Sequence, residues 1–275
     1  MAKLTVAFQG ERGSFSEEAA YKLLGRGIRV LPCETFAKIF ASVASGPANY
    51  CLVPIENTLA GSVYENFDLL LANNLHIVSE VSLRIVHNLI AMPGTRRKDV
   101  REVYSHPVAL AQCERFFVKN PRIKRVTFYD TAGAVKMLAE RRPPGAAAIA
   151  SRIAAEVYDA HILQTHLEDH RENYTRFFLL SKTSRVSPKA NKVSIVFSTR
   201  NIPGALYKCL SVFALRDIDL SKMESRPLRG RPWEYFFYLD FVGNVKEERC
   251  KNALAHLGEV TNFLRVLGCY ESAKR

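Results

Sequence analysis

The feature that most constrains the fold is a repeated junction, in which a short apolar strand runs straight into a polar loop or helix start. It occurs five times in the first 151 residues, after strands expected at residues 4–8, 50–53, 102–104, 126–129 and 146–150. Strands that alternate with helices in this way predict an α/β fold with helices packed on parallel strands. Because the pattern repeats in both halves of this region, we expect two lobes with a cleft between them.

The first junction combines two glycines with the start of a helix. Gly10 and Gly13 precede Ser14, and Ser14 with Glu17 has the spacing of a capping box. The free backbone N–H groups at such a helix start suit a carboxylate or phosphate, although a strand-to-helix turn without a ligand explains the same residues. The dinucleotide pattern GxGxxG is absent, so we expect no Rossmann cofactor.

Two further junctions place polar side chains at the ends of buried strands, where α/β proteins build ligand sites. The loop expected after residue 54 offers polar groups and one glycine that allows close backbone approach, namely Glu56, Asn57, Thr58, Gly61 and Ser62. The next junction reads Ser105, His106, Pro107. His106 is placed like a site residue, but a histidine that caps a helix beside a proline is an equally good interpretation.

A polar run enters an apolar strand at residues 172–178, where Asn173, Thr175 and Arg176 stand directly before two phenylalanines. A loop that faces solvent has little reason for this arrangement, whereas a cleft that grips a charged small molecule does. The guanidinium of Arg176 suits a substrate carboxylate, or equally a structural ion pair with Glu172. We favour the structural ion pair.

The formal net charge of +12 raises the question of a nucleic-acid partner. Residues 1–190 carry 25 Lys and Arg against 18 Asp and Glu, and residues 191–275 carry 14 against 9. The excess positive charge is therefore spread along the chain and forms no basic tail. Because no interleaved aromatic platform accompanies the basic clusters, we expect solvated faces and no nucleic-acid partner.

Metal, disulfide and membrane functions find little support. The six cysteines show no CxxC pair, which disfavours a zinc ribbon or disulfide framework and fits a reducing cytoplasm. His166 and His170 have the spacing of a zinc helix, but Leu167 replaces the glutamate of the HExxH signature, so we expect no metal. With no apolar run of membrane length and no signal peptide, we expect a cytoplasmic protein, or an organelle protein whose transit peptide has been removed.

A polar, proline-bearing stretch between residues 181 and 192 predicts a domain boundary. Beyond it, strand and helix signals follow the ferredoxin-like order βαββαβ, with a hairpin turn at residues 229–232. We expect two domains, at residues 1–183 and 192–275.

Taken in order, the motifs resemble prephenate dehydratase over nearly the whole chain. The resemblance rests on residues 10–16, residues 54–58 with Gly61 and Ser62, residues 105–107, residues 130–132, and Asn173 with residues 175–177. The tail resembles the ACT regulatory domain of that family. Two positions depart from the family pattern, because Val108 stands where glutamine is common and Tyr174 replaces a usually smaller residue.

The resemblance implies a bilobed catalytic domain like type II periplasmic binding proteins, joined to an ACT domain that assembles a homodimer or homotetramer and binds phenylalanine as effector. The implied reaction is loss of carbon dioxide and water from prephenate, without a metal or cofactor. Arogenate dehydratases share the motifs, so arogenate stays open as the substrate. A sensor of amino acids without catalysis is the third reading, since such clefts and ACT domains also serve binding alone.

The resemblance also implies roles for particular residues. Thr175 is expected to contact the leaving hydroxyl, with His106 as the alternative proton source because an imidazole titrates in the right range. The substrate would be held by polar and aromatic residues around the cleft: Ser14, Asn57, Thr58, Gly61, Ser62, Ser105, Asn173, Arg176 and Phe177. Phenylalanine would be held by two ACT motifs: Gly204, Ala205 and Leu206, then Glu224, Ser225, Arg226 and Pro227.

Overall fold

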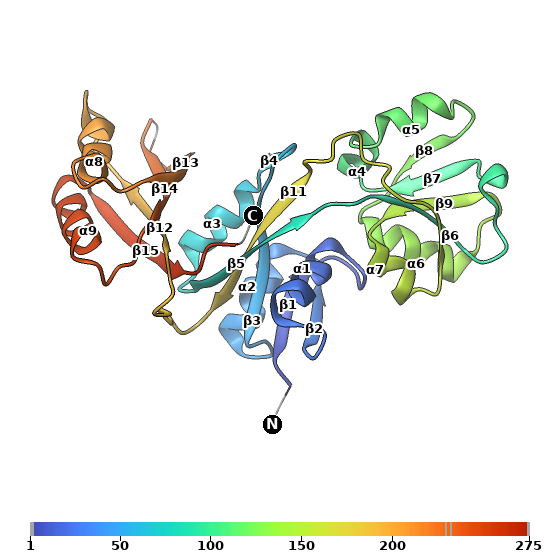
Figure 1. The fold of residues 1–275 in the computed structure, drawn as a ribbon, viewed down its shortest axis with the longest axis horizontal. Coiled ribbons are helices and arrows are strands. Elements are labelled where there is room, and N and C mark those ends of the chain that lie inside the picture. Colours follow the sequence, from blue (N-terminus) through green and yellow to red (C-terminus); the bar gives the residue numbers. More distant parts are fainter. Residues whose placement is uncertain (1–2, 229, 232, 274–275) are drawn as a thin grey trace. The chain divides into compact units, whose positions relative to one another are not determined.

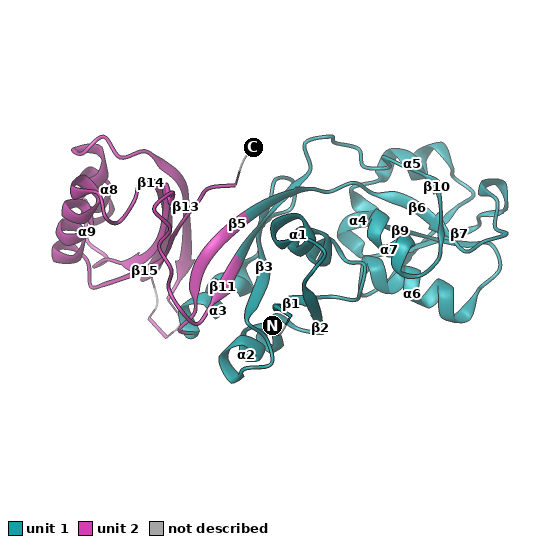
Figure 2. Cartoon of the chain, turned by 60° about the horizontal axis from the view of Figure 1, so that its bottom comes forward, with its two compact units in different colours: residues 1–73, 81–178, 275 teal, residues 74–80, 179–274 magenta. Residues whose placement is uncertain are grey.

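The computed structural model describes residues 3–228, 230–231 and 233–273 (Figure 1). Arg229 and Pro232, which belong to the predicted hairpin turn, lie outside the described residues. The chain forms two compact units (Figure 2): unit 1 holds residues up to 73 and 81–178, and unit 2 holds residues 74–80 and those from 179 onward. The division falls inside two strands, β5 (His76–Arg84) and β11 (Tyr174–Ser181), which run from one unit into the other. The domain limits 1–183 and 192–275 stay a prediction.

The first lobe of unit 1 is a sheet with the strand order β11-β3-β1-β2, in which β1, β2 and β3 are parallel. In it, β1 (Thr5–Gln9) pairs in parallel with β2 (Arg29–Cys33) and with β3 (Tyr50–Asn57). Three helices and a two-residue strand complete the lobe: α1 (Phe15–Leu24), α2 (Phe36–Ser45), β4 (Gly61–Ser62) and α3 (Tyr64–Ala72). The carboxyl ends of β1 and β3 therefore meet at one edge of the sheet, beside the start of α1.

The second lobe of unit 1 is a five-stranded sheet with the order β10-β6-β9-β7-β8. Its strands are β6 (Asn88–Ala91), β7 (Glu102–Ser105), β8 (Lys124–Thr127), β9 (Ala146–Ala150) and β10 (His161–Gln164). Its helices are η1 (Arg97–Asp99), α4 (Pro107–Ala111), α5 (Glu114–Lys119), α6 (Thr131–Arg141) and α7 (Arg152–Val157). The green elements of Figure 1 show this lobe.

The central strand β9 packs against helices on both faces of this sheet. All five of its residues are buried. Ala147 and Ile149 join the core formed with α4 and α5, whereas Ala146, Ala148 and Ala150 join the core formed with α6 and α7. A strand covered on both faces reads as a continuous apolar run instead of an alternating one, and that is the pattern of residues 146–150.

Unit 2 contains an antiparallel sheet with the order β13-β14-β12-β15. The elements are β12 (Lys192–Ser198), α8 (Ala205–Ala214), β13 (Leu220–Pro227), β14 (Tyr235–Val242), α9 (Glu248–Val260) and β15 (Phe263–Tyr270). Both helices contribute to one core with the sheet, in which Phe197, Phe213 and Leu257 are fully buried. The chain order is βαββαβ, so the predicted ferredoxin-like arrangement is confirmed.

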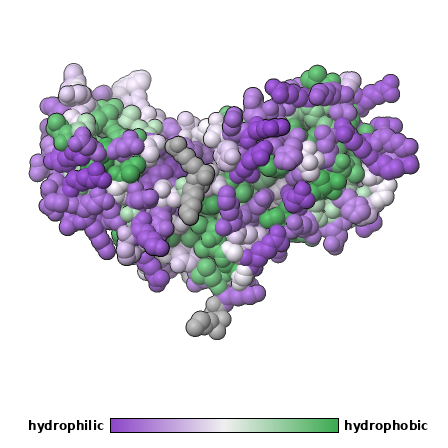
Figure 3. Space-filling model, viewed as in Figure 1, coloured by the Kyte–Doolittle hydropathy of each residue, from purple (hydrophilic) through white to green (hydrophobic). Residues whose placement is uncertain are grey.

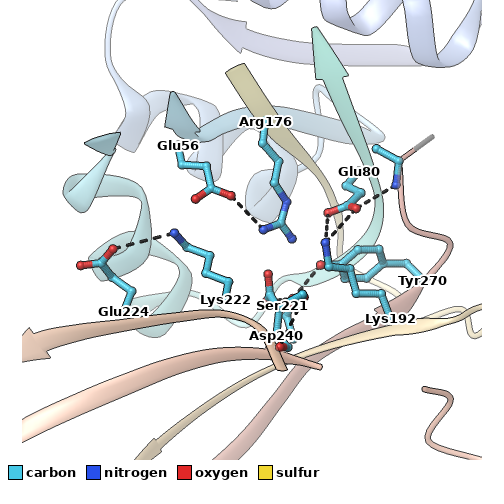
Figure 4. Close-up of polar contacts among 11 residues, drawn as sticks. Glu56, Glu80, Arg176, Lys192, Ser221, Lys222, Glu224, Asp240 and Tyr270 are labelled. Atoms are coloured by element: carbon cyan, nitrogen blue, oxygen red, sulfur yellow. Dashed lines mark hydrogen bonds and ion pairs between the residues drawn. The ribbon is translucent and has the colours of Figure 1, made fainter. Parts of the chain in front are cut away.

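Two close contacts join residues 74–80 to the rest of unit 2. Gly268 of β15 pairs with Ile77 of β5, and a Cβ atom at Gly268 would lie 2.1 Å from the Ile77 carbonyl oxygen, so only glycine fits there. The buried carboxylate of Glu80 lies 3.1 Å from Lys192 Nζ (Figure 4). The segment is thereby attached to the ACT-like sheet by backbone packing and by an ion pair.

Two local expectations are corrected. Strand β3 does not end at Pro54 but continues to Asn57; its pairing with β1 covers residues 50–52, so the missing N–H group of Pro54 costs no bond to β1. The segment that carries His166 and His170 is neither helix nor strand, and His166 adopts a left-handed backbone with φ 58°. The two histidines therefore do not share a helix face.

The described residues include no group of three or more His, Cys, Asp or Glu side chains that could hold a metal ion. All six cysteines are free thiols, and five of them are buried. Hydrophilic side chains predominate on the face shown in Figure 3. Among the described residues, no helix is long and apolar enough to cross a membrane.

Candidate active site

Asn57 stands at the carboxyl end of β3 with its side-chain amide held from both sides. Its Oδ1 accepts hydrogen bonds from the backbone N–H groups of Leu59 and Ala60, at 3.0 and 2.8 Å. Its Nδ2 lies 2.7 Å from Asn173 Oδ1 and 2.9 Å from Thr175 Oγ1. Because an amide N–H can only donate, Thr175 Oγ1 is the acceptor, and this bond leaves the hydroxyl proton of Thr175 to other acceptors.

Thr58 connects the loop after β3 to the start of β11. Its hydroxyl donates to the carbonyl of Glu172 at 2.7 Å and accepts from the backbone N–H of Tyr174 at 3.0 Å. Its own backbone N–H donates to the Tyr174 carbonyl at 2.9 Å. The single proton of the Thr58 hydroxyl is thus used within the protein, and the side chain holds the two segments together.

Asn173 lies between the Asn57 amide and the second lobe. Its side chain is fully buried, and its Nδ2 donates to Gln112 Oε1 at 2.8 Å. His87 Nε2 lies 2.9 Å from the same oxygen, and the buried imidazole meets the ring of Phe15 edge-on at 5.5 Å between centroids. Burial lowers the pKa of His87, which keeps the ring neutral.

Gln112 and His87 were not predicted as site residues. Gln112 is a single polar side chain at the end of an apolar helix run, and this was the signal that the sequence offered for it. His87 precedes the apolar strand β6. Neither position belongs to a motif with a recognisable spacing. The structure adds both to the polar network around Thr175.

The start of α1 already holds an anionic group of the protein. Ser14 is the N-cap and accepts from the backbone N–H of Glu17 at 3.4 Å. The carboxylate of Glu17, fully buried, accepts from the Gly13 N–H at 2.6 Å and pairs with Arg12 Nε at 3.0 Å. The anion expected at this helix start is therefore the carboxylate of Glu17, which accepts a hydrogen bond from the Gly13 N–H.

Asp130 caps the start of α6 and accepts from the Gly133 N–H at 2.7 Å. Its pKa is raised, chiefly by burial and further by the nearby charge of Glu11. The carboxyl lines a hollow of about 240 Å³ together with Gln9, Gly10, Glu11, Pro32, Cys33, Glu34 and Tyr129. A Cβ atom at Gly10, whose φ is 107°, would lie 2.9 Å from Asp130 Oδ2, so glycine gives the carboxyl its space.

His106 is half-buried and caps α4, with Nδ1 accepting from the Val108 N–H at 3.3 Å. A neutral ring in this geometry carries its proton on Nε2. A charged His106 side chain would lower the pKa of Asp130, against the larger effect of burial, which raises it. The structure therefore confirms the helix-cap interpretation of His106, and its role in the site stays a prediction.

The two lobes are joined next to the start of α1. Ser151 Oγ donates to the Gly13 carbonyl at 2.5 Å, and Glu11 accepts from Tyr129 and Lys136 at 2.9 and 3.1 Å. A Cβ atom at Gly13 would lie 2.6 Å from the Cα of Ala154. Glycine at position 13 is therefore required by the close approach of the lobes as well as by its φ of 84°.

Three predicted substrate contacts lie away from an open surface. Ser105 is fully buried and donates to the Ile149 carbonyl at 2.6 Å, and Phe177 is 2% exposed. Arg176 pairs with Glu56 at 3.1 Å (Figure 4), and its guanidinium lies over the ring of Phe178. The expected partner Glu172 is thus replaced by Glu56, and the burial of Ser105 and Phe177 favours a packing role for both.

The remaining predicted residues lie on β4 and in unit 2. Gly61 pairs with Asn57, and Ser62 pairs with Glu56, so β4 holds the loop after β3 in place. Gly204 caps α8 with a left-handed φ of 80°, and Ala205 and Leu206 begin that helix. The second effector motif is on β13, an end strand of the ACT-like sheet in the order described above: Glu224, which lies 3.8 Å from Lys222 (Figure 4), Ser225, Arg226 and Pro227.

The fold and these polar residues define a bilobed α/β unit like type II periplasmic binding proteins, followed by an ACT-type unit. Residues 6–185 match the family model described as prephenate dehydratase. The chain is 44% identical to arogenate dehydratase/prephenate dehydratase 2, chloroplastic, of Arabidopsis thaliana, over 98% of this chain and 73% of that protein. It is 42% identical to arogenate dehydratase 2 of Petunia hybrida, over 98% of this chain and 72% of that protein.

Solved structures agree with this assignment. Prephenate dehydratase from Arthrobacter aurescens in complex with L-Phe superimposes with a TM-score of 0.89 at 31% identity, over 98% of this chain and 90% of that one. GqqA, described as a novel type of quorum quenching acylase, gives a TM-score of 0.91 at 33% identity, over 98% of both chains. The chain belongs to the prephenate dehydratase family, a family of dehydratases, which are carbon–oxygen lyases.

Proposed function

We propose that the protein converts prephenate or arogenate into an aromatic product in the biosynthesis of phenylalanine. The observation that carries this proposal is the bond between Asn57 Nδ2 and Thr175 Oγ1, which makes the threonine oxygen an acceptor and directs its proton to another partner. Membership of the family supplies the reaction class. The departing ring hydroxyl is the partner that we assign to Thr175.

The reaction breaks two bonds and forms a new ring double bond. The C–C bond to the ring carboxylate breaks and its electron pair completes the aromatic ring, while the C–O bond breaks and the hydroxyl leaves with its electron pair. The departing oxygen takes up one proton and becomes water, and the carboxylate becomes carbon dioxide. A positioned proton donor for such a leaving group contributes roughly 10²–10⁴-fold to the rate.

Thr175 is the candidate for the contact with the leaving group in the proposal, and His106 is the alternative proton source. The threonine hydroxyl is too weak an acid to give up its proton at neutral pH, so it donates a hydrogen bond to the departing oxygen. To supply the proton, His106 must be the imidazolium, in which Nδ1 also carries a hydrogen and gives up its bond from the Val108 N–H.

The substrate carboxylate that leaves as carbon dioxide is best bound by neutral donors, because a tight cation would stabilise it before the reaction. The structure supports this view, since Arg176 is engaged by Glu56. In the proposal Asn57, Asn173 and the loop that holds Thr58, Gly61 and Ser62 shape the cleft, and Ser14 lies at the helix start beside it.

The test is to incubate the purified protein with prephenate and, separately, with arogenate. Phenylpyruvate from prephenate or phenylalanine from arogenate would support the dehydratase and would decide between the two substrates. A third arm uses an N-acyl amide, because the GqqA neighbour supports amide hydrolysis as a second candidate function. No product in any arm would refute catalysis and leave the sensor of amino acids as the better explanation.

We further propose that residues 1–183 form the catalytic domain and residues 192–275 an ACT domain that binds phenylalanine near Gly204 and near residues 224–227. The L-Phe bound to the Arthrobacter aurescens relative supports this assignment. Assembly into a homodimer or homotetramer belongs to the same proposal. If phenylalanine changes neither turnover, nor melting temperature, nor mass in light scattering, the assignment is wrong.

The chloroplastic relatives support an organelle stroma as the location, with the cytoplasm as the alternative.

A further inference from the structure

We infer that His87 is a positioning residue for this reaction, and that it acts through Gln112 and Asn173 on the amide that orients Thr175. The inference rests on the proposed function, in which the Thr175 hydroxyl serves the leaving group. It is carried by an unbroken line of hydrogen bonds whose donor and acceptor roles can be assigned one after another.

The direction of the line is set by the backbone. Leu59 and Ala60 present N–H groups, which can only donate, so the Asn57 side chain must turn Oδ1 toward them and Nδ2 away. That Nδ2 faces Asn173 Oδ1 at 2.7 Å. The side chain of Asn173 must then turn its own Nδ2 to the other side, where Gln112 Oε1 accepts at 2.8 Å.

The last step assigns the tautomer of His87. Gln112 Oε1 is an acceptor, so the imidazole nitrogen 2.9 Å away must carry a proton, which places the hydrogen on Nε2. Among the residues that the structure describes, His87 Nδ1 is buried without a hydrogen-bond partner. A proton on Nδ1 instead of Nε2 would leave a buried N–H unpaired and set two lone pairs against each other.

His87 is held in place on every side. The ring is 2% exposed and edge-on to Phe15, its backbone N–H donates to Glu168 Oε2 at 3.0 Å, and its backbone carbonyl accepts from Leu167 at 2.9 Å. A rigid donor at this point keeps Gln112 from rotating its amide. If Gln112 rotated, its NH₂ group would face the NH₂ group of Asn173, and Asn57 would lose its fixed partner.

The first test reads the tautomer without any activity measurement. Selective ¹⁵N labelling of histidine and NMR of the folded protein should show His87 as the neutral Nε2–H form at pH 7. A neutral Nδ1–H form, or a charged ring, would overturn the inference even if the dehydratase reaction is demonstrated.

The second test is kinetic and uses a matched pair of variants. His87→Leu removes the donor and should lower kcat by about 10- to 100-fold with little change in KM, since misplacing a reacting group by about 1 Å can cost about 100-fold. His87→Gln brings an amide N–H near the former Nε2 and should recover most of the lost kcat. Equal kcat loss in both variants, with melting temperatures within a few degrees of the wild type, would show a merely structural role.

A double variant separates this inference from the function on which it rests. In a Thr175→Val background, His87→Leu should cause no further loss of kcat, because the group that it positions is already absent. A full additional loss there would overturn the positioning role. Near-normal turnover of Thr175→Val alone would instead refute the role of Thr175, while the NMR result on His87 would stand by itself.

Discussion

Replacement of Thr175 by valine removes one hydroxyl and little else. Valine keeps the β-branched shape that suits strand β11, so the strand should form as before. Asn57 Nδ2 keeps two other acceptors, Asn173 Oδ1 at 2.7 Å and the Tyr174 carbonyl at 3.1 Å. The lost hydrogen bond should therefore cost only about 0.5–1.5 kcal/mol of stability, and the variant should fold.

The effect on catalysis should be much larger than the effect on stability. We expect Thr175→Val to lower kcat by roughly 100-fold or more, which corresponds to about 2.7 kcal/mol of transition-state stabilisation. Thr175→Ser keeps a hydroxyl at the same place and should retain most of the turnover. Thr127→Val, an exposed threonine on β8, is the matched control and should behave as wild type.

The assay is the rate of product formation from prephenate or arogenate at saturating substrate, with circular dichroism and thermal melting on each variant. A folded Thr175→Val protein with turnover within about threefold of the wild type, a change below 1 kcal/mol, would refute the role of Thr175. A loss equal in Thr175→Val and Thr127→Val would point to a general defect of the preparation instead.

Two further predictions concern stability. Gly13→Ala should lower the free energy of unfolding, measured by chemical denaturation, by several kcal/mol more than Gly25→Ala. Both glycines have a positive φ, which costs about 1–3 kcal/mol for a residue with a side chain. Only at Gly13 would the added Cβ also meet another backbone, because it would lie 2.6 Å from Ala154 Cα. Equal costs would show that the lobes separate easily there. Burial lowers the pKa of His87 below its usual 6.5, while Gln112 and Glu168 raise it, so the folded state resists protonation. The contribution of His87 to the free energy of unfolding should be fully present above about pH 6.5. It should decrease as the pH drops, by up to about 1.4 kcal/mol per pH unit. His87→Gln should flatten that slope between pH 7 and 5, and an unchanged slope would contradict the assignment.

The sequence by itself determined the features that depend on neighbouring residues. The strand at residues 146–150, the cap formed by Ser14 and the order βαββαβ of the tail were all predicted and are present, because apolar spacing and capping chemistry act within a few residues. The motifs in their order also carried the family resemblance. The match of residues 6–185 to the family model confirms that resemblance.

Only the tertiary structure decided which polar groups meet. Asn57 and Asn173 are 116 residues apart and touch because strands β3 and β11 bring them to one place. The same docking gives Arg176 a partner 120 residues away, Glu56, whereas the sequence suggested the near neighbour Glu172. His87 and Gln112, inconspicuous beside apolar runs, join the site for this reason. A hydrogen bond depends on the position and direction of two groups in space, and for groups so far apart in the chain the folded backbone alone sets both.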